Sequence, residues 1–150
     1  MRYDIVSDTH GHISEELESA LQGADVIVHA GDICSDIDLL HLETIAPVHA
    51  CYGNNDWGYD YGPFVMHNIT RFFSEGLRWE ICHYRERLDL ETCEVAVCGH
   101  THRPFVEKDP RTGALVMNPG SPTYPRAGYP SMGRIIVEKG AILSAEIIRL

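Results

Sequence analysis

The sequence lacks the long apolar runs that a membrane-spanning helix requires. Residues 25–30 form one of its strongest apolar stretches, which is far shorter than the roughly 18 residues needed to cross a bilayer. The first residues lead directly into a strand-like run without the apolar core of a signal peptide. We therefore expect no membrane partner and a cytoplasmic location.

Basic residues are also scarce, with 12 Lys and Arg against 22 Asp and Glu and a formal net charge of -10 at pH 7. A protein that grips nucleic acid needs clustered basic side chains to displace counterions from the phosphates. We therefore expect no stable nucleic-acid complex, and a nuclease is disfavoured. Carboxylates that bind divalent cations would account for part of the acidic excess.

The cysteines do not form a disulfide pattern, because their number is odd, at five, and no two are spaced as a CxxC pair. This favours reduced, mostly buried thiols. The length of 150 residues suits a single domain over residues 1–150, and no repeat or interdomain linker interrupts it. The sequence is compatible with a homo-oligomer.

The first half of the chain alternates strand-like and helix-like segments. Apolar runs at residues 2–7, 25–30 and 47–52 predict strands. Two intervening segments predict helices, which begin at Ser14 and at residues 35–36. This alternation is typical of strand–helix units around a largely parallel sheet.

The second half has the pattern of hairpins around short turns. Three pairs of strand-like runs flank turns, at 69–73 with 77–83, 106–108 with 114–118, and 134–138 with 142–150. A further short strand is predicted at 95–98. The combination predicts an α/β protein with mixed sheets.

Polar clusters follow the strand-like runs and contain the candidate chemistry. In chain order they are Asp8-Thr9-His10, Gly31-Asp32, Gly53-Asn54-Asn55-Asp56, His83, and Gly99-His100-Thr101-His102. Ligands of open α/β sheets bind at the carboxyl ends of the strands, so these clusters should converge. In extended backbone, residues two apart point to the same side, which lets each Asp-x-His or His-x-His pair chelate one centre.

The types of side chain in these clusters favour divalent transition metals. Carboxylates, imidazoles and one amide oxygen suit manganese, iron, zinc, cobalt or nickel better than calcium or copper(I). Seven such groups suffice for two ions. A bridging carboxylate can hold two cations roughly 3.5–4 Å apart, where they activate a shared water for attack on a phosphoryl group. Asp32 is the best bridge candidate, as the lone acidic residue of its cluster.

The ordered clusters resemble the calcineurin-like metallophosphoesterase superfamily, whose pattern is DxH, GD, GN(x)D or GNHE, a single His, and GHxH. The match spans Asp8 to His102, and Asn118-Pro119-Gly120-Ser121 extends it. In length and in this last element the chain is similar to the small bacterial and archaeal phosphodiesterases. The resemblance implies a four-layer αββα sandwich, in which two mixed β-sheets are flanked by helices.

The same resemblance implies two divalent metal ions, with manganese expected first and iron, zinc, nickel or cobalt as alternatives. The implied ligands of one ion are Asp8, His10, Asp32 and His102. Those of the other are Asp32, Asn54, His83 and His100. Catalytic roles are implied for Asp32, Asn54 and His100.

The chain departs from the family pattern at two positions. Asn55 stands where protein phosphatases have a His that protonates the leaving group and where small phosphodiesterases commonly have Cys. An amide does not supply a catalytic proton at neutral pH. His83-Tyr84-Arg85 replaces the usual HGH, which changes a position that bears on substrate choice.

Further residues are candidates for contacting the substrate or for supporting the site. The candidate substrate contacts are Asn55, His12 and Arg126. A set of aromatic residues is equally consistent with an apolar wall for a nucleobase or with ordinary packing: Trp57, Tyr59, Tyr61, Phe64 and Tyr124. Asp56 is expected to be a turn residue or a partner of the ligands, and the turn at 118–121 is expected to orient the GHxH loop rather than to contact phosphate.

The sequence therefore predicts a hydrolase that cleaves phosphodiesters or activated phosphomonoesters with a hydroxide held between two metal ions. Its substrate would be a small phosphate ester, including a nucleotide-like one. The alternative is a catalytically weak or inactive scaffold of the same fold that serves as a protein-interaction module. The presence of all seven candidate ligands favours the enzyme.

Overall fold

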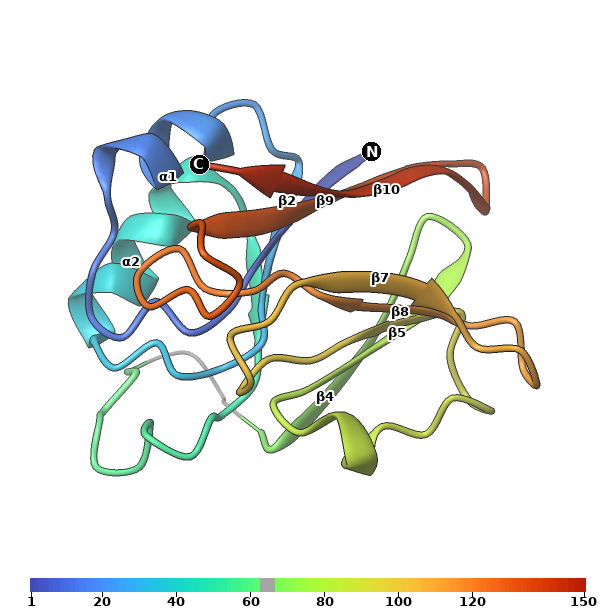
Figure 1. Cartoon of the computed structure of the whole chain (residues 1–150), viewed down its shortest axis with the longest axis horizontal. Helices are drawn as coiled ribbons and strands as arrows, with labels where there is room; N and C mark the ends of the chain where they lie inside the picture. Colours follow the sequence, from blue (N-terminus) through green and yellow to red (C-terminus); the bar gives the residue numbers. More distant parts are fainter. Residues whose placement is uncertain (63–66) are drawn as a thin grey trace.

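The computed structural model describes residues 1–62 and 67–150, and in these residues the strands form two five-stranded mixed sheets (Figure 1). The first sheet has the strand order β10-β9-β1-β2-β3, and the second has the order β4-β5-β6-β8-β7. The strands are β1 (Arg2–Val6), β2 (Val26–His29), β3 (Val48–Ala50), β4 (Ile69–Ser74), β5 (Leu77–Cys82), β6 (Val95–Val97), β7 (Phe105–Lys108), β8 (Leu115–Asn118), β9 (Ser131–Glu138) and β10 (Ala141–Arg149).

Strand direction decides where the loops meet. β1, β2 and β3 run parallel, so their carboxyl ends lie at one edge of the first sheet. β5, β6 and β8 are parallel in the second sheet. The three hairpins predicted from the sequence are confirmed as the antiparallel pairs β4–β5, β7–β8 and β9–β10.

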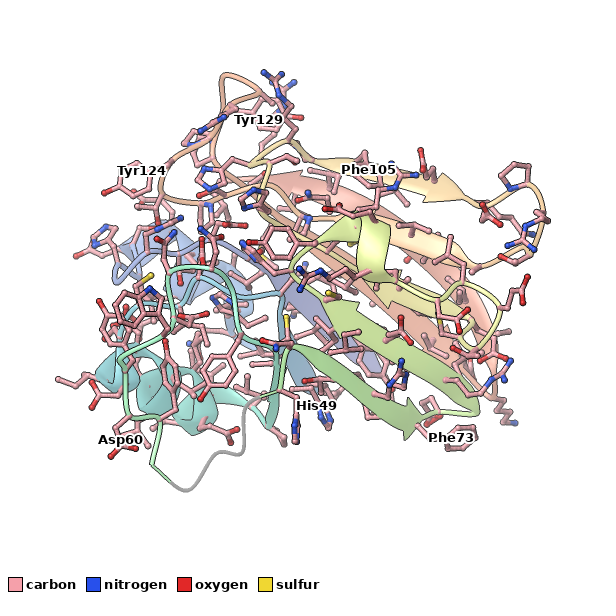
Figure 2. The ribbon with its side chains drawn as sticks, turned by 90° about the horizontal axis from the view of Figure 1, so that it is seen from below. His49, Asp60, Phe73, Phe105, Tyr124 and Tyr129 are labelled. Atoms are coloured by element: carbon pink, nitrogen blue, oxygen red, sulfur yellow. The ribbon has the colours of Figure 1, made fainter. Side chains whose placement is uncertain are left out.

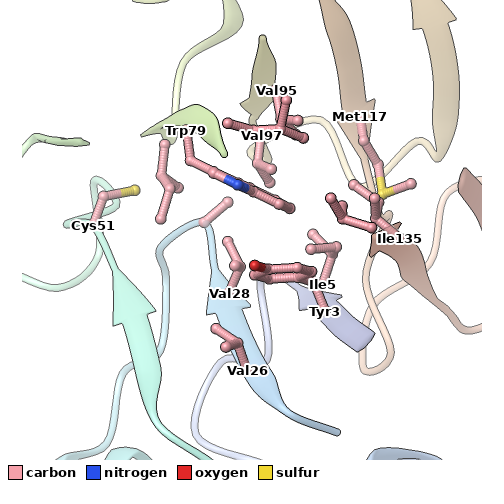
Figure 3. Close-up of a cluster of buried hydrophobic side chains, with 14 residues drawn as sticks. Tyr3, Ile5, Val26, Val28, Cys51, Trp79, Val95, Val97, Met117 and Ile135 are labelled. Atoms are coloured by element: carbon pink, nitrogen blue, oxygen red, sulfur yellow. The ribbon is translucent and has the colours of Figure 1, made fainter. Parts of the chain in front are cut away.

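The main core lies between the two sheets (Figure 3). Tyr3 and Ile5 of β1 face Trp79 of β5, and the Tyr3 and Trp79 ring centroids are 4.4 Å apart. Gly133 of β9 allows close approach at this point, because a Cβ atom there would lie 2.3 Å from the sulfur of Met117. Truncation of a buried aromatic residue such as Trp79, which is 1% exposed, is expected to cost about 3–5 kcal/mol.

Both α-helices of the described residues cover the outer face of the first sheet. α1 (Glu15–Leu21) and α2 (Asp36–Ile45) pack there through Leu17, Leu21 and Leu42. Ser14 and Ser35 are the N-cap residues, since their hydroxyls accept hydrogen bonds from the backbone N–H groups three residues later. The two helix starts predicted from the sequence are therefore confirmed.

The outer face of the second sheet is partly covered by the segment that follows the 3-10 helix η1 (Arg85–Arg87). Leu88, Leu90 and Cys93 pack there against Ala96 and Val116. This arrangement confirms the predicted α/β sandwich of two mixed sheets with helices outside. The five cysteines are free thiols, and all but the half-buried Cys34 are buried. Within the described residues, no helix is long and apolar enough to span a membrane.

Candidate metal centre

The predicted polar clusters lie at the carboxyl ends of neighbouring strands. The loops that follow β1 and β2 extend the parallel pairing beyond the strands: the Asp8 N–H donates to the Gly31 carbonyl and the His10 N–H to the Asp32 carbonyl, both at 3.0 Å. Gly99 N–H donates to the His83 carbonyl at 3.1 Å. Tyr124 lies at this end of the molecule, and Phe73 in the β4–β5 hairpin lies at the opposite end (Figure 2).

The backbone at these loops is left-handed, which corrects the extended conformation expected from the sequence. The non-glycine residues with positive φ include five of the seven candidate ligands: Asp8 (56°), His10 (51°), Asp32 (57°), His100 (72°) and His102 (58°). For L-residues this conformation costs roughly 1–2 kcal/mol each. Such strain persists only where surrounding contacts hold it, and it concentrates at functional sites.

The side chains of Asp8, His10, Asp32, His83 and His102 converge on one small region. Asp8 Oδ1 lies 3.2 Å from His102 Nε2 and 3.7 Å from both His10 Nε2 and His83 Nε2. Asp32 Oδ2 lies 3.4 Å from His83 Nε2 and 3.7 Å from His10 Nε2. The ligand atoms form two overlapping groups, Asp8-His10-His102 and Asp8-Asp32-His83, and within each group they lie within 4.8 Å of one another.

The two remaining candidate ligands flank this cluster. His100 Nδ1 is 3.1 Å from Asn54 Oδ1, and the His100 ring centroid is 5.1 Å from that of His83. Tyr84 also contacts the His100 ring, at 4.9 Å between centroids. All seven residues singled out from the sequence therefore lie at the same end of the sandwich.

Two buried polar atoms without a hydrogen-bond partner indicate that this set of side chains suits a cation. Among the described residues, buried Asp8 Oδ1 and His83 Nε2 have no hydrogen-bond partner, although an unsatisfied buried polar atom costs about 1–3 kcal/mol. His83 Nδ1 and His102 Nδ1 each lie 2.7 Å from a backbone carbonyl, of Ala30 and Tyr124, so the N–H of each neutral ring is used there. This leaves the Nε2 lone pairs free, as a metal ligand requires. The residues fit the divalent ions implied by the sequence.

The charges of the cluster also suit a cation. Burial would raise the pKa of the Asp8 carboxyl, but the adjacent imidazoles of His10 and His102 bring it well below its ordinary value. Burial likewise opposes ionisation of Asp32, yet contacts with His83 and the Asn55 N–H lower its pKa. Both carboxylates are therefore ionised at neutral pH, so they concentrate negative charge on two buried side chains.

Buried residues behind the ligands hold the loops in place. Asn118 Nδ2 donates to the Gly99 carbonyl at 3.0 Å and to Thr101 Oγ1 at 3.1 Å, and Ser121 Oγ donates to the Asp8 carbonyl at 2.7 Å. The turn at 118–121 thus orients the ligand loops, as expected. His29, which lies outside the sequence motifs, also belongs to this layer. It is fully buried beside Thr9 and Gly31, a role that no spacing in the sequence signals.

The candidate substrate contacts differ in their distance from the cluster. Asn55 touches it directly, because its N–H and Nδ2 donate to the two carboxylate oxygens of Asp32 at 2.9 and 3.0 Å. Arg126 is exposed and its backbone N–H donates to the His102 carbonyl at 3.1 Å. His12 is exposed two residues after His10.

The aromatic residues do not form one continuous wall. Tyr124 is exposed (Figure 2). Its ring centroid lies 5.4 Å from that of His10. Trp57 is 84% exposed and, with Tyr59, lines a pocket of about 330 Å³ beside Gly53. Tyr61 is buried and its hydroxyl donates to Asp56. The expectation for Phe64 falls outside the described residues.

Comparison with known proteins identifies the family. The chain matches the calcineurin-like phosphoesterase superfamily domain over residues 1–140. A probable metallophosphoesterase of Methanothermobacter thermautotrophicus is 34% identical over 99% of this chain and 92% of its own length. The chain belongs to the calcineurin-like phosphoesterase superfamily, as the sequence motifs predicted. This membership supports a metal-dependent phosphoesterase.

Solved structures share the fold along the whole chain. A structure described as a novel archaeal phosphodiesterase is 25% identical, covers all of both chains and superposes with a TM-score of 0.78. Vps29 of Entamoeba histolytica, solved in complex with Zn²⁺, is 17% identical with a TM-score of 0.74 and covers 100% of this chain and 98% of its own. The second likeness concerns the fold alone.

Proposed function

We propose that this protein is a two-metal phosphodiesterase that acts on a small phosphodiester or an activated phosphomonoester. The observation that carries the proposal is the pair of orphaned buried atoms, Asp8 Oδ1 and His83 Nε2, within a cluster of carboxylates and imidazoles. The likeness to an archaeal phosphodiesterase at 25% identity supports a diester as the substrate. Manganese is the first metal to test, since the donor set is borderline in softness.

We assign the seven residues to two ions by the family pattern. Asp8, His10 and His102 would hold one ion together with Asp32. Asn54, His83 and His100 would hold the other, again with Asp32. The position of Asp32 Oδ2 between His10 and His83, at 3.7 and 3.4 Å, supports the shared role. Two bound divalent ions would polarise a phosphoryl oxygen and lower the pKa of a water between them.

The protein's own groups orient the substrate and keep the ligands in their reactive form. Asp8 and Asp32 stay ionised, while the carbonyls of Ala30 and Tyr124 fix the ring orientations of His83 and His102. The exposed Arg126 beside the His102 loop would contact a phosphate oxygen, a role that a guanidinium fork suits. The exposed His12, two residues after His10, would be a further substrate contact.

Asn55 affects substrate choice because its side chain does not supply a proton to the leaving group. Its amide donates to Asp32 Oδ2, so it holds the shared carboxylate rather than delivering a proton to a leaving group. The loss of general acid catalysis typically costs about 10²–10⁴-fold, but little when the leaving group departs without a proton. The proposed substrates therefore have good leaving groups.

The alternative function is a protein-interaction scaffold, and the likeness of the fold to Vps29 is the observation that favours it. We rank it second because the candidate ligands are all present and converge. We also propose that residues 1–150 form one domain, since one core joins Tyr3 to Val137, and that the protein is cytoplasmic, where its five free thiols would stay reduced.

Metal analysis combined with turnover tests both functions. The chelator-treated protein would be titrated with Mn²⁺ and then assayed with bis(p-nitrophenyl) phosphate, p-nitrophenyl phosphate and dinucleotides. We expect two ions per chain and the fastest hydrolysis with the diester. No more than one ion at saturating Mn²⁺ would refute the two-metal proposal, and two bound ions without turnover across the panel would favour the scaffold.

A further inference from the structure

Asp56 has an environment that a turn residue does not need. Its side chain is fully buried, and no Lys or Arg pairs with it in the part of the chain that the structure describes. Its carboxylate accepts five hydrogen bonds, from the backbone N–H groups of Asp32 (2.8 Å), Ile33 (2.9 Å), Cys34 (3.0 Å) and Gly53 (2.7 Å) and from the Tyr61 hydroxyl (2.6 Å). Three of these donors lie 22 to 24 residues earlier in the chain. The carboxylate therefore serves another loop as well as its own.

The three consecutive donors form an anion-binding nest. Asp32 and Cys34 both have φ of 57°, and this left-handed conformation turns the N–H groups of residues 32–34 toward a single point. Without an acceptor at that point, the three N–H groups would lack a hydrogen-bond partner, which is unfavourable for buried donors. The negative charge of Asp56 thus stabilises a backbone conformation that L-residues otherwise avoid.

The carboxylate of Asp56 also joins two ligand loops. One loop carries Asp32, the proposed shared ligand, and the other carries Asn54, the proposed amide ligand. The carboxylate Oδ2 accepts from both Asp32 N–H and Gly53 N–H, and Asn54 follows directly in the chain. The loops are in close contact here, because a Cβ atom on Gly53 would lie 2.1 Å from Asp32 Oδ1. A change at Asp56 therefore reaches both the turn that aims Asp32 and the start of the loop that aims Asn54.

We propose that Asp56 is a positioning residue of the metal centre: its buried carboxylate fixes the left-handed turn at residues 32–34 and so sets the direction of the Asp32 side chain. This inference rests on the proposed two-metal function. Asp56 itself would not serve as a ligand, because its two oxygens accept from the five donors. Its effect is on metal affinity, through the geometry of Asp32 and Asn54.

The test is the affinity for Mn²⁺, measured by calorimetric titration of chelator-treated protein. Asp56→Asn keeps the size of the side chain but removes its charge and one acceptor oxygen. We expect Mn²⁺ to bind about 10–100-fold more weakly, which is the usual effect of losing a partner that orients a metal ligand. Glu80→Gln is the matched control, because Glu80 is also a buried carboxylate but is bonded to Arg71 and the Asp89 N–H, away from the cluster.

The outcomes separate this inference from the proposed function. If the unaltered protein does not bind Mn²⁺, the two-metal function fails. If it binds Mn²⁺ and folded Asp56→Asn retains the same affinity, or loses no more than Glu80→Gln does, the role of Asp56 is refuted. If Asp56→Asn does not fold, Tyr61→Phe provides the test. This variant removes the hydroxyl that donates to Asp56, and we expect it to weaken Mn²⁺ binding about 2–10-fold. An unchanged affinity in folded Tyr61→Phe would then overturn the proposal.

Discussion

His29 should make the stability of the metal-free protein depend on pH in a defined window. The imidazole is fully buried at the end of β2, directly behind the ligand loops. Gly31 N–H donates to its Nδ1 at 3.2 Å, so Nε2 is the protonated nitrogen, and it lies 2.9 Å from Thr9 Oγ1. Burial lowers the pKa of His29 from 6.5 to about 4. The ring is therefore neutral in the folded protein at neutral pH.

The sign of the effect follows from proton binding. Between pH 6.5 and about 4 the unfolded chain protonates His29 but the folded chain does not, so stability falls as the pH falls. Because one pH unit corresponds to about 1.4 kcal/mol, His29 should remove about 3 kcal/mol over this window. Other site groups act outside it: the raised pKa of His102, caused by Asp8, matters above pH 6.5, and the lowered pKa of Asp8 matters below its ordinary 3.8.

Urea unfolding of chelator-treated protein at several pH values between 6.5 and 4.5 measures this dependence. His29→Gln removes the titratable ring while leaving an amide that can hydrogen-bond to Thr9. We expect the variant to be less stable at pH 6.5 but to have a much flatter pH profile. Parallel profiles for the two proteins would show that His29 is not the group responsible, and the reasoning from its burial would be wrong.

Three further outcomes are expected at the site itself. Asp32→Asn should abolish hydrolysis of a phosphodiester more completely than Asn54→Ala, since the former disturbs both ions; equal residual rates with both metals bound would count against Asp32 as the shared ligand. Asn55→His should accelerate alkyl monoesters by about 10–10³-fold while barely affecting nitrophenyl esters. A flat dependence of the native rate on leaving-group pKa, with chemistry limiting, would point to another proton donor. Asn118→Ala should weaken Mn²⁺ binding about 10-fold in calorimetric titrations, because the Gly99–Thr101 loop loses two hydrogen bonds, and unchanged binding would make that turn dispensable.

The strands and helices of this protein could be predicted because their signals are local. Ser14 and Ser35 each precede acidic residues and then apolar ones at helical spacing, and both are N-caps in the structure. The turns at 75–76 and 139–140 separate strand-like runs, which predicts the antiparallel pairing that the structure shows. Element ends were less accurate, as β3 spans only Val48–Ala50 within the predicted 47–52.

The convergence of the polar clusters was predictable, but their backbone was not. Parallel strands bring their carboxyl ends to one edge, so the order of Asp8, Asp32 and Asn54 along the chain already implied proximity. The left-handed conformation of Asp8 or His102 has no comparable signal, because non-glycine residues rarely adopt it by local preference. It is imposed by contacts from distant segments, such as Ser121 Oγ on the Asp8 carbonyl.

Those distant contacts explain how a strained site is kept in shape. Asp56 holds the turn at Asp32, Ser121 holds the carbonyl of Asp8, and the Asp8 carboxylate in turn accepts the His100 N–H at 3.0 Å. Each interaction joins loops from different strands, so no single loop could keep its conformation if the others were removed. The donor groups are thereby arranged by the fold rather than by the ions. Residues that bind no metal, such as Asp56, should consequently affect metal affinity as a ligand does, which sequence motifs alone do not reveal.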